Sequence, residues 1–188
     1  MAGSQHSFVT IPPGRDKLDV LEDALSTALR DGERAMVFGN TQAAVRAAEH
    51  HLRERGIPTV CYHGEMPRDA RREAIEAFAG AHAQGQGQGQ GRPPVMVCSD
   101  LAARGLDVPG RVDLVVNFDF PLTAVDYLHR TGRTARAGAP GRVTSLVAKR
   151  DRVLAARIEW ALQRGEPLDE LSADKNVLPP GQRRGGWV

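Results

Sequence analysis

The sequence lacks the features that mark membrane-spanning, secreted or disulfide-stabilised proteins. Its 188 residues include only two cysteines, Cys61 and Cys98, which have no metal-ligand spacing and form no disulfide framework. We therefore expect two buried free thiols in a reducing compartment. No apolar run approaches the roughly 20 residues that a membrane span needs, so no membrane partner is expected. Residues 1–7 contain no apolar segment of the signal-peptide type.

Other shortages narrow the classes of function. Aromatic residues make up only 5% of the chain, which argues against an RNA binder that stacks bases on an aromatic surface. The formal net charge is only +2, so the protein is not a polycation. The pattern G-x-x-x-x-G-K-[ST] is absent, and the Asp-Glu-Ala-Asp acidic element is absent as well. The chain therefore has no phosphate-cradling loop of that kind and no matching magnesium-binding acid.

Apolar strand-like runs alternate with helix-like segments along the chain. This order predicts an α/β fold, a single domain with a parallel sheet covered by helices on both faces. The expected strands are 8–11, 34–38, 59–63, 95–98, 113–118 and 141–148. The expected helices are 16–30, 41–55, 67–79 and 151–164, a short turn at 101–103, and a helix that begins at Thr123 or Asp126.

Three stretches fall outside this alternation. Residues 1–7 are predicted to be a disordered end, and residues 8–165 to form the domain. The Gln-Gly repeats at 80–94 cannot contribute to a core, so they predict a flexible surface loop. Residues 166–188, with their Pro and Gly, predict a mostly disordered tail.

Residues 127–136, Tyr-Leu-His-Arg-Thr-Gly-Arg-Thr-Ala-Arg, carry arginines at a spacing of three. On one helical face, Arg130, Arg133 and Arg136 could meet several oxygens of a polyphosphate. A solvated basic surface is the alternative. The loops after four predicted strands hold polar residues at 39–41, 63–65, 99–100 and 117–121. Because parallel strands end on one edge of a sheet, these loops predict a shared binding surface.

With these segments in order, the chain resembles the C-terminal RecA-like lobe of DEAD-box RNA helicases. Val-Phe-Gly-Asn-Thr at 37–41 is similar to motif IV, and Ser-Asp-Leu-Ala-Ala-Arg-Gly-Leu-Asp at 99–107 is similar to motif V. His-Arg-Thr-Gly-Arg-Thr-Ala-Arg at 129–136 matches the motif VI pattern H-R-x-G-R-x-x-R in full. The resemblance covers roughly residues 8–165. Segments 119–121, 127–129 and 154–159 look most like plant plastid members associated with ribosomal RNA.

The resemblance implies roles for the arginine segment and for motif V. Arg133 and Arg136 would be arginine fingers that stabilise charge on ATP during hydrolysis. Asp107 would accept hydrogen bonds from the ribose, although a turn cap is an alternative role for it. Arg104 would help the contact between lobes. His129 and Arg130 would face the other lobe, although a packing role is an alternative for His129.

The resemblance also implies RNA contacts through loop backbones and short polar side chains, which would give sequence-independent binding that weakens with salt. The candidates are Asn40, Thr41, Gly64, Arg71, Ser99 and Asp100. Asp100 carries the wrong charge for phosphate, so we expect it to brace its loop through backbone bonds. The family usually has Thr where Ser99 stands and often Gln where Arg68 stands.

The missing phosphate loop predicts half of an enzyme. ATP and Mg²⁺ would be held mainly by an N-terminal RecA-like lobe, and this lobe would close over ATP and RNA. Alone, the chain is expected to be a monomer that does not hydrolyse ATP. The alternatives are a stand-alone module that binds RNA or ribosomal particles, and a nucleotide-binding α/β domain of another sort. The parent protein could belong to the plastid, the nucleus or the cytoplasm.

Overall fold

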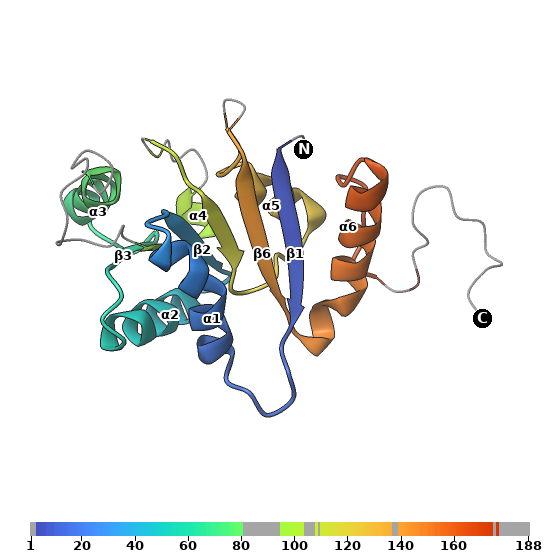
Figure 1. Ribbon diagram of the computed structural model, residues 1–188, viewed down its shortest axis with the longest axis horizontal. Coiled ribbons are helices and arrows are strands. Elements are labelled where there is room, and N and C mark those ends of the chain that lie inside the picture. The colour runs from blue at the N-terminus through green and yellow to red at the C-terminus, as the bar shows by residue number, and fades with distance from the viewer. Residues whose placement is uncertain are drawn as a thin grey trace.

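The computed structural model describes residues 3–80, 95–103, 108, 110–136, 139–174 and 176. Strands and helices alternate along these segments (Figure 1). The strands are β1 Ser4–Thr10, β2 Ala35–Gly39, β3 Thr59–Tyr62, β4 Val95–Ser99, β5 Leu114–Asn117 and β6 Gly141–Val147. The helices are α1 Lys17–Arg30, α2 Gln42–Glu54, α3 Arg68–Gly80, α4 Asp100–Ala103, α5 Ala124–Thr131 and α6 Arg152–Arg164, with a 3-10 turn at Lys149–Asp151.

Local side chains cap the N-termini of three helices. Asp16 accepts a hydrogen bond from the backbone N–H of Leu18 at 2.9 Å, and Thr41 accepts one from that of Ala44 at 3.1 Å. Such caps satisfy backbone donors that have no partner within the first helical turn. Thr123 caps α5 in the same way. The expected helix starts at positions 16 and 41 are therefore confirmed, and of the two expected starts of α5, Thr123 and Asp126, Thr123 is the cap.

The six strands form one parallel sheet in the order β1-β6-β5-β2-β4-β3. One face packs against α1 and α2, and the other against α3, α5 and α6. Side chains alternate between the two cores along each central strand, so that Met36 and Phe38 enter one core and Val37 the other. The predicted α/β sandwich is confirmed.

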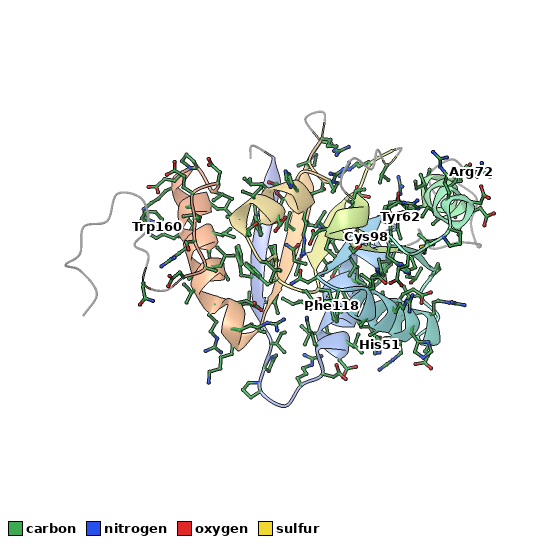
Figure 2. The ribbon with its side chains drawn as sticks, turned by 180° about the vertical axis from the view of Figure 1, so that it is seen from behind. His51, Tyr62, Arg72, Cys98, Phe118 and Trp160 are labelled. Atoms are coloured by element: carbon green, nitrogen blue, oxygen red, sulfur yellow. The ribbon has the colours of Figure 1, made fainter. Side chains whose placement is uncertain are left out.

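Figure 2 shows the side chains from behind, with Cys98 and Phe118 in the interior and Arg72 on α3. Cys98 is fully buried, as expected, whereas Cys61 is only half-buried. Burial raises the pKa of the Cys61 thiol to about 11, and it raises that of Cys98 further, so both thiols stay protonated at neutral pH. Within the described segments, no helix is long and apolar enough to cross a membrane.

The prediction that residues 1–7 are disordered is wrong for residues 4–7. Strand β1 begins at Ser4 and pairs in parallel with β6, with His6 opposite Val143. Polar residues occupy inward positions in this edge strand, which is why its start gives no apolar signal. The His6 ring is held by a 2.7 Å hydrogen bond between its Nδ1 and the hydroxyl of Tyr127.

The expected disordered tail is also wrong for its first part. Beyond Gly165, which ends α6 with a φ of 67°, Leu168 and Leu171 enter the core beside α6. Arg157 donates hydrogen bonds to the carbonyls of Ser172 and, at 2.9 Å, of Asp174. Leu168 and Leu171 show no helical periodicity in the sequence. The sequence therefore did not predict that these two side chains pack in the core. The rest of the tail and the loop from 81 to 94 lie outside the described residues.

We expect Leu168→Ala to lower the free energy of unfolding by about 2 kcal/mol or more, because it removes a buried side chain from the core. Equilibrium urea denaturation measures this loss. Leu122→Ala is the matched control, because the Leu122 side chain is 70% exposed and the same truncation should change little. Equal effects of the two substitutions would show that the segment after α6 adds nothing to the domain.

Candidate functional site

The carboxyl ends of three neighbouring strands meet at one edge of the sheet, which we call the rim. Strand β2 leads to Asn40, β4 to Asp100, and β5 ends at Asn117 and leads to Asp119. Helix α5 then places Arg130 among them. Residues that lie up to 90 positions apart in the chain therefore bond to one side chain.

Arg130 lies at the centre of the rim with a side chain only 1% exposed. Its Nε and Nη2 donate to the two carboxylate oxygens of Asp100 at 2.6 and 2.5 Å. The second Nη2 bond goes to the side-chain oxygen of Asn40 at 2.6 Å. Nη1 donates to the carbonyl of Asp119 at 2.6 Å and to the side-chain oxygen of Asn117 at 3.2 Å.

These contacts use all five N–H donors of the guanidinium, and a lysine could not reproduce this planar arrangement. The guanidinium also lies 5.4 Å from the ring centroid of Phe38, which covers it from the core side. The rim therefore depends on a buried, fully hydrogen-bonded cation paired with one carboxylate.

This geometry corrects two expectations. We expected Arg130 to face another lobe, but the side chain points inward, because Asp100 and three other acceptors surround it. We also expected Asp100 to brace its loop through backbone bonds. Instead, its carboxylate braces the rim through the ion pair with Arg130, which leaves it unsuited to contact RNA directly.

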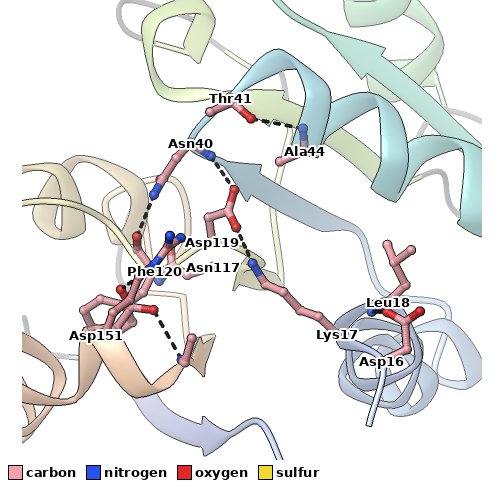
Figure 3. Close-up of polar contacts among 12 residues, drawn as sticks. Asp16, Lys17, Leu18, Asn40, Thr41, Ala44, Asn117, Asp119, Phe120 and Asp151 are labelled. Carbon is pink, nitrogen blue, oxygen red and sulfur yellow. Dashed lines mark hydrogen bonds and ion pairs between the residues drawn. The ribbon is translucent and has the colours of Figure 1, made fainter. Parts of the chain in front are cut away.

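Asp119 forms a second junction that the sequence reading missed. Its carboxylate is paired with Lys17 from α1 and accepts the backbone N–H of Asn40 at 2.9 Å (Figure 3). The side-chain amide of Asn40 donates to the carbonyl of Phe120 at 2.9 Å. Asn40 thus uses its backbone N–H and both ends of its amide within the protein. An acid directly after the expected strand 113–118 was the available signal for Asp119.

The other two arginines of the motif lie at the surface. Helix α5 ends at Thr131, so the spacing of three no longer places residues on one helical face. Arg133 is half-buried, with its Nε 3.3 Å from the carbonyl of His129, and Arg136 is exposed, with its Nε 2.8 Å from the carbonyl of Gly132. The expected shared face of three arginines is wrong, because Arg130 turns inward.

His129 and Arg133 line a shallow recess together with Asp100, Asp126 and Arg130. This recess borders the rim. Arg133 therefore lies on the same part of the surface as the ion pair between Arg130 and Asp100. Arg104 and Asp107 lie outside the described residues, and their expected positions beside the nucleotide stay predictions.

Three of the remaining RNA candidates, Thr41, Ser99 and Gly64, lie at strand ends, and the fourth, Arg71, lies in α3. Thr41 is exposed beside Asn40, and Ser99 is buried at the end of β4. Gly64 is exposed after β3. Arg71 in α3 is half-buried, and its Nε is buried with no hydrogen-bond partner within the described part of the chain. An arginine N–H can only donate a hydrogen bond, and a phosphate oxygen is a suitable acceptor for it.

Possible metal ligands are largely engaged. At the rim, Asp100 is paired with Arg130 and Asp119 with Lys17. Elsewhere in the described segments, Asp19, Glu22 and His51 lie within 4.8 Å of one another across α1 and α2. Arg55 already balances this group, at 3.4 Å from Asp19 and 3.5 Å from Glu22.

A parallel sheet with an arginine-rich motif at its rim defines a RecA-like helicase lobe. Residues 16–138 match the family "Helicase conserved C-terminal domain", and the chain belongs to this family. It is a C-terminal domain of the DEAD-box type, as its similarity to DEAD-box relatives shows.

Two curated relatives illustrate the similarity. DEAD-box ATP-dependent RNA helicase 39 of Arabidopsis thaliana is 48% identical over 174 residues, which cover 93% of this chain and 26% of that protein. ATP-dependent RNA helicase DBP2 of Saccharomyces cerevisiae is 35% identical over 91% of this chain and 30% of that protein. The chain thus spans between a quarter and a third of the length of these relatives.

The solved structures agree on the fold. The Escherichia coli DEAD-box protein SrmB, bound to regulator of ribonuclease activity A, has a TM-score of 0.69 and 30% identity, with 98% of both chains covered. The C-terminal domain of the DEAD-box protein Dbp5 has a TM-score of 0.66 and 25% identity, with 87% of this chain and 85% of that chain covered.

We expect Asp100→Asn to lower the free energy of unfolding by about 3 kcal/mol, because it leaves the buried guanidinium of Arg130 without its counter-ion. Thermal and urea denaturation measure the change. Glu65→Gln is the matched control, since its ion pair with Arg46 is exposed and should contribute at most about 1 kcal/mol. A loss no larger than the control would contradict the central role of the Arg130 ion pair.

Proposed function

We propose that this chain is the second lobe of an ATP-dependent RNA helicase and completes an ATP site on an N-terminal lobe. One observation carries the proposal. The motif divides into a buried arginine that organises the rim and two arginines at the surface, Arg133 and Arg136. The surface pair lies where a second protein domain could present a nucleotide to it.

Phosphoryl transfer depends on positioning and on stabilising the charge that spreads over the transferred group. Arg133 and Arg136 would supply that stabilisation as arginine fingers, and their planar donors suit phosphate oxygens. The rim offers no vacant carboxylate for Mg²⁺ among its described residues, since Asp100 and Asp119 are paired. The residues present are suited to contact a nucleotide that another domain holds. The N-terminal lobe would hold this ATP and its Mg²⁺. Asp107 would contact the ribose, and Arg104 would help the contact between the lobes.

RNA would bind along the strand ends without sequence preference. Thr41 and Gly64 are exposed at two of these ends, and the half-buried Arg71 on α3 would add a guanidinium suited to phosphate. Asn40, Ser99 and Asp100 would act by shaping the loops, because their groups are buried or engaged within the rim. Contacts to phosphates and sugars position RNA but carry no base sequence.

The isolated chain would not hydrolyse ATP, because its sequence contains no phosphate loop. The same absence supports a second candidate function, a stand-alone module that binds RNA or ribosomal particles without turnover.

The segments at 119–121, 127–129 and 154–159 support a role of the parent protein with ribosomal RNA in plastids. The lobe would act as a monomer. Expression of the parent protein with a fluorescent tag would test the compartment.

We expect the chain to give RNA-stimulated ATP hydrolysis when it is fused to an N-terminal lobe of the same family. Arg136→Ala should lower the rate by on the order of 10³-fold, the effect of removing an arginine finger. A phosphate-release assay measures it. Arg72→Ala is the control, because that arginine is exposed on α3 and pairs only with Asp69 and Glu76 in the described segments. Unchanged hydrolysis in Arg136→Ala would refute the finger assignment.

We expect the isolated lobe to bind single-stranded RNAs of different sequence with similar affinity, and the affinity should fall as salt rises. Arg71→Ala should weaken binding about equally for every sequence and reduce the salt slope by roughly one phosphate contact. Fluorescence anisotropy at several salt concentrations measures both effects. Strong preference for one sequence would instead indicate base readout. Tight RNA binding combined with no turnover in the fused protein would favour the stand-alone module.

A further inference from the structure

The turn after β6 carries a run of exposed cations. Residues 149–152, Lys-Arg-Asp-Arg, form the 3-10 turn Lys149–Asp151 and the first residue of α6. Lys149, Arg150 and Arg152 are all exposed. The proposed function gives no role to this segment, which we call the basic turn.

The one acid of the basic turn points into the protein. The carboxylate of Asp151 accepts the backbone N–H of Ala148 at 3.2 Å, and its side chain is 16% exposed, against 76% for Arg150. The Nε of Arg150 lies 3.6 Å from an oxygen of Asp151, which is too far for a hydrogen bond. In the part of the chain that the structure describes, Lys149 and Arg152 pair with no carboxylate. The basic turn therefore presents three cations to solvent and little of its acid.

The other acids at this end of the sheet are held by groups outside the basic turn. Asp119 is paired with Lys17, and Asp23 is paired with Arg15. Asp16 caps the first turn of α1. Among the described residues, none of these three carboxylates forms an ion pair with the basic turn, so direct contact does not cancel its positive charge.

The register of the sheet places the basic turn beside the rim. Asn117 of β5 lies opposite Ser145 of β6, so that two residues further along, Asp119 and Val147 leave the two strands at the same level. Neighbouring strands lie about 4.8 Å apart, and the turn that follows Val147 is therefore next to the Asp119 junction of the rim. In Figure 1, both β1 and β6 run downward to this edge, and α6 begins there.

This position continues the row of strand ends that carries the RNA candidates. The order β6-β5-β2-β4-β3 puts the basic turn on one side of β2, and the exposed Gly64, which follows β3, on the other. Thr41 follows β2, two strand spacings or roughly 10 Å from the end of β6. An RNA strand that contacts Gly64 and Thr41 and continues along this edge therefore reaches the basic turn within a few more nucleotides.

The chemistry of the basic turn suits a phosphate backbone. Arginine offers planar pairs of donors to phosphate oxygens, and lysine offers a point charge on a flexible stem. The four residues include no apolar or aromatic side chain that could enter a membrane or stack on a base. Three cations within four residues match a ligand with repeated negative charge. Single-stranded RNA is the favoured ligand, because the neighbouring strand ends already offer it contacts.

We propose that the basic turn is an accessory RNA-binding surface: Lys149, Arg150 and Arg152 contact backbone phosphates of single-stranded RNA that extends beyond the ends of β3, β4 and β2. The inference rests on RNA binding in the proposed function and adds a second contact surface for the same ligand. It implies a longer RNA footprint with no added base preference, since phosphate contacts carry no sequence.

Two single-stranded RNAs test the proposal with the whole chain and without ATP. An RNA of about 5 nucleotides covers the strand ends alone, whereas one of about 12 nucleotides is long enough to reach the basic turn as well. Lys149→Gln, Arg150→Gln and Arg152→Gln are combined in one variant, the basic-turn variant. Fluorescence anisotropy over a series of salt concentrations measures the affinity for each RNA.

The matched control combines Arg30→Gln, Arg53→Gln and Arg164→Gln. These arginines are exposed in the last turns of α1, α2 and α6. The three helices begin at the rim edge and end at the opposite edge of the sheet. The control therefore removes the same net charge from a region that the proposed RNA path does not cross.

We expect the basic-turn variant to bind the longer RNA on the order of tenfold more weakly at low salt. Its salt slope should fall by about 2, because each phosphate contact on a single strand contributes about 0.7. The affinity for the shorter RNA should change by less than about twofold, as in the control. In the unaltered chain, the backbone amide resonances of residues 149–152 should shift with the longer RNA and stay in place with the shorter one.

Equal affinities and salt slopes for the basic-turn variant and the control would overturn the proposal, even with RNA still bound at the strand ends. Equal weakening for the two RNA lengths would also overturn it, because that result indicates a general effect of charge. If the unaltered chain bound neither RNA, RNA binding in the proposed function would fail together with the accessory surface. Should the combined variant not fold, Lys149→Gln alone decides through a slope change of about 0.7 for the longer RNA.

Discussion

The rim depends on one buried cation, the guanidinium of Arg130, whose five donors meet five acceptors. Burying a charge is unfavourable unless it is paired and hydrogen-bonded, and here the pairing with Asp100 is bidentate. This single side chain is hydrogen-bonded to residues at or just beyond the ends of three strands. Any surface that the rim presents therefore depends on this buried ion pair for its geometry.

The three arginines of this one short motif therefore lie in different environments. Arg130 organises the interior, whereas Arg133 and Arg136 lie where a ligand could reach them. The end of α5 at Thr131 produces this division, because the chain leaves the helix between the first and second arginines.

Much of the fold could be predicted from the sequence. Buried parallel strands are continuous apolar runs, so β2, β4 and β5 were evident, and Asp16 and Thr41 marked their helices by local chemistry. The edge strand β1 was only half predicted, because its inward positions include Ser4 and His6. The family was recognised by its motifs, but the inward direction of Arg130 was not predicted.

The sequence by itself determined the order of strands and helices, the helix caps and the family motifs, because these depend on neighbours within a few residues. Tertiary structure alone decided which arginine is buried, that Asp119 pairs with Lys17, and that Leu168 and Leu171 join the core. Each of these contacts joins segments distant in the chain or without a periodic pattern. Their free energy depends on desolvation and on partners that only the closed sheet brings together.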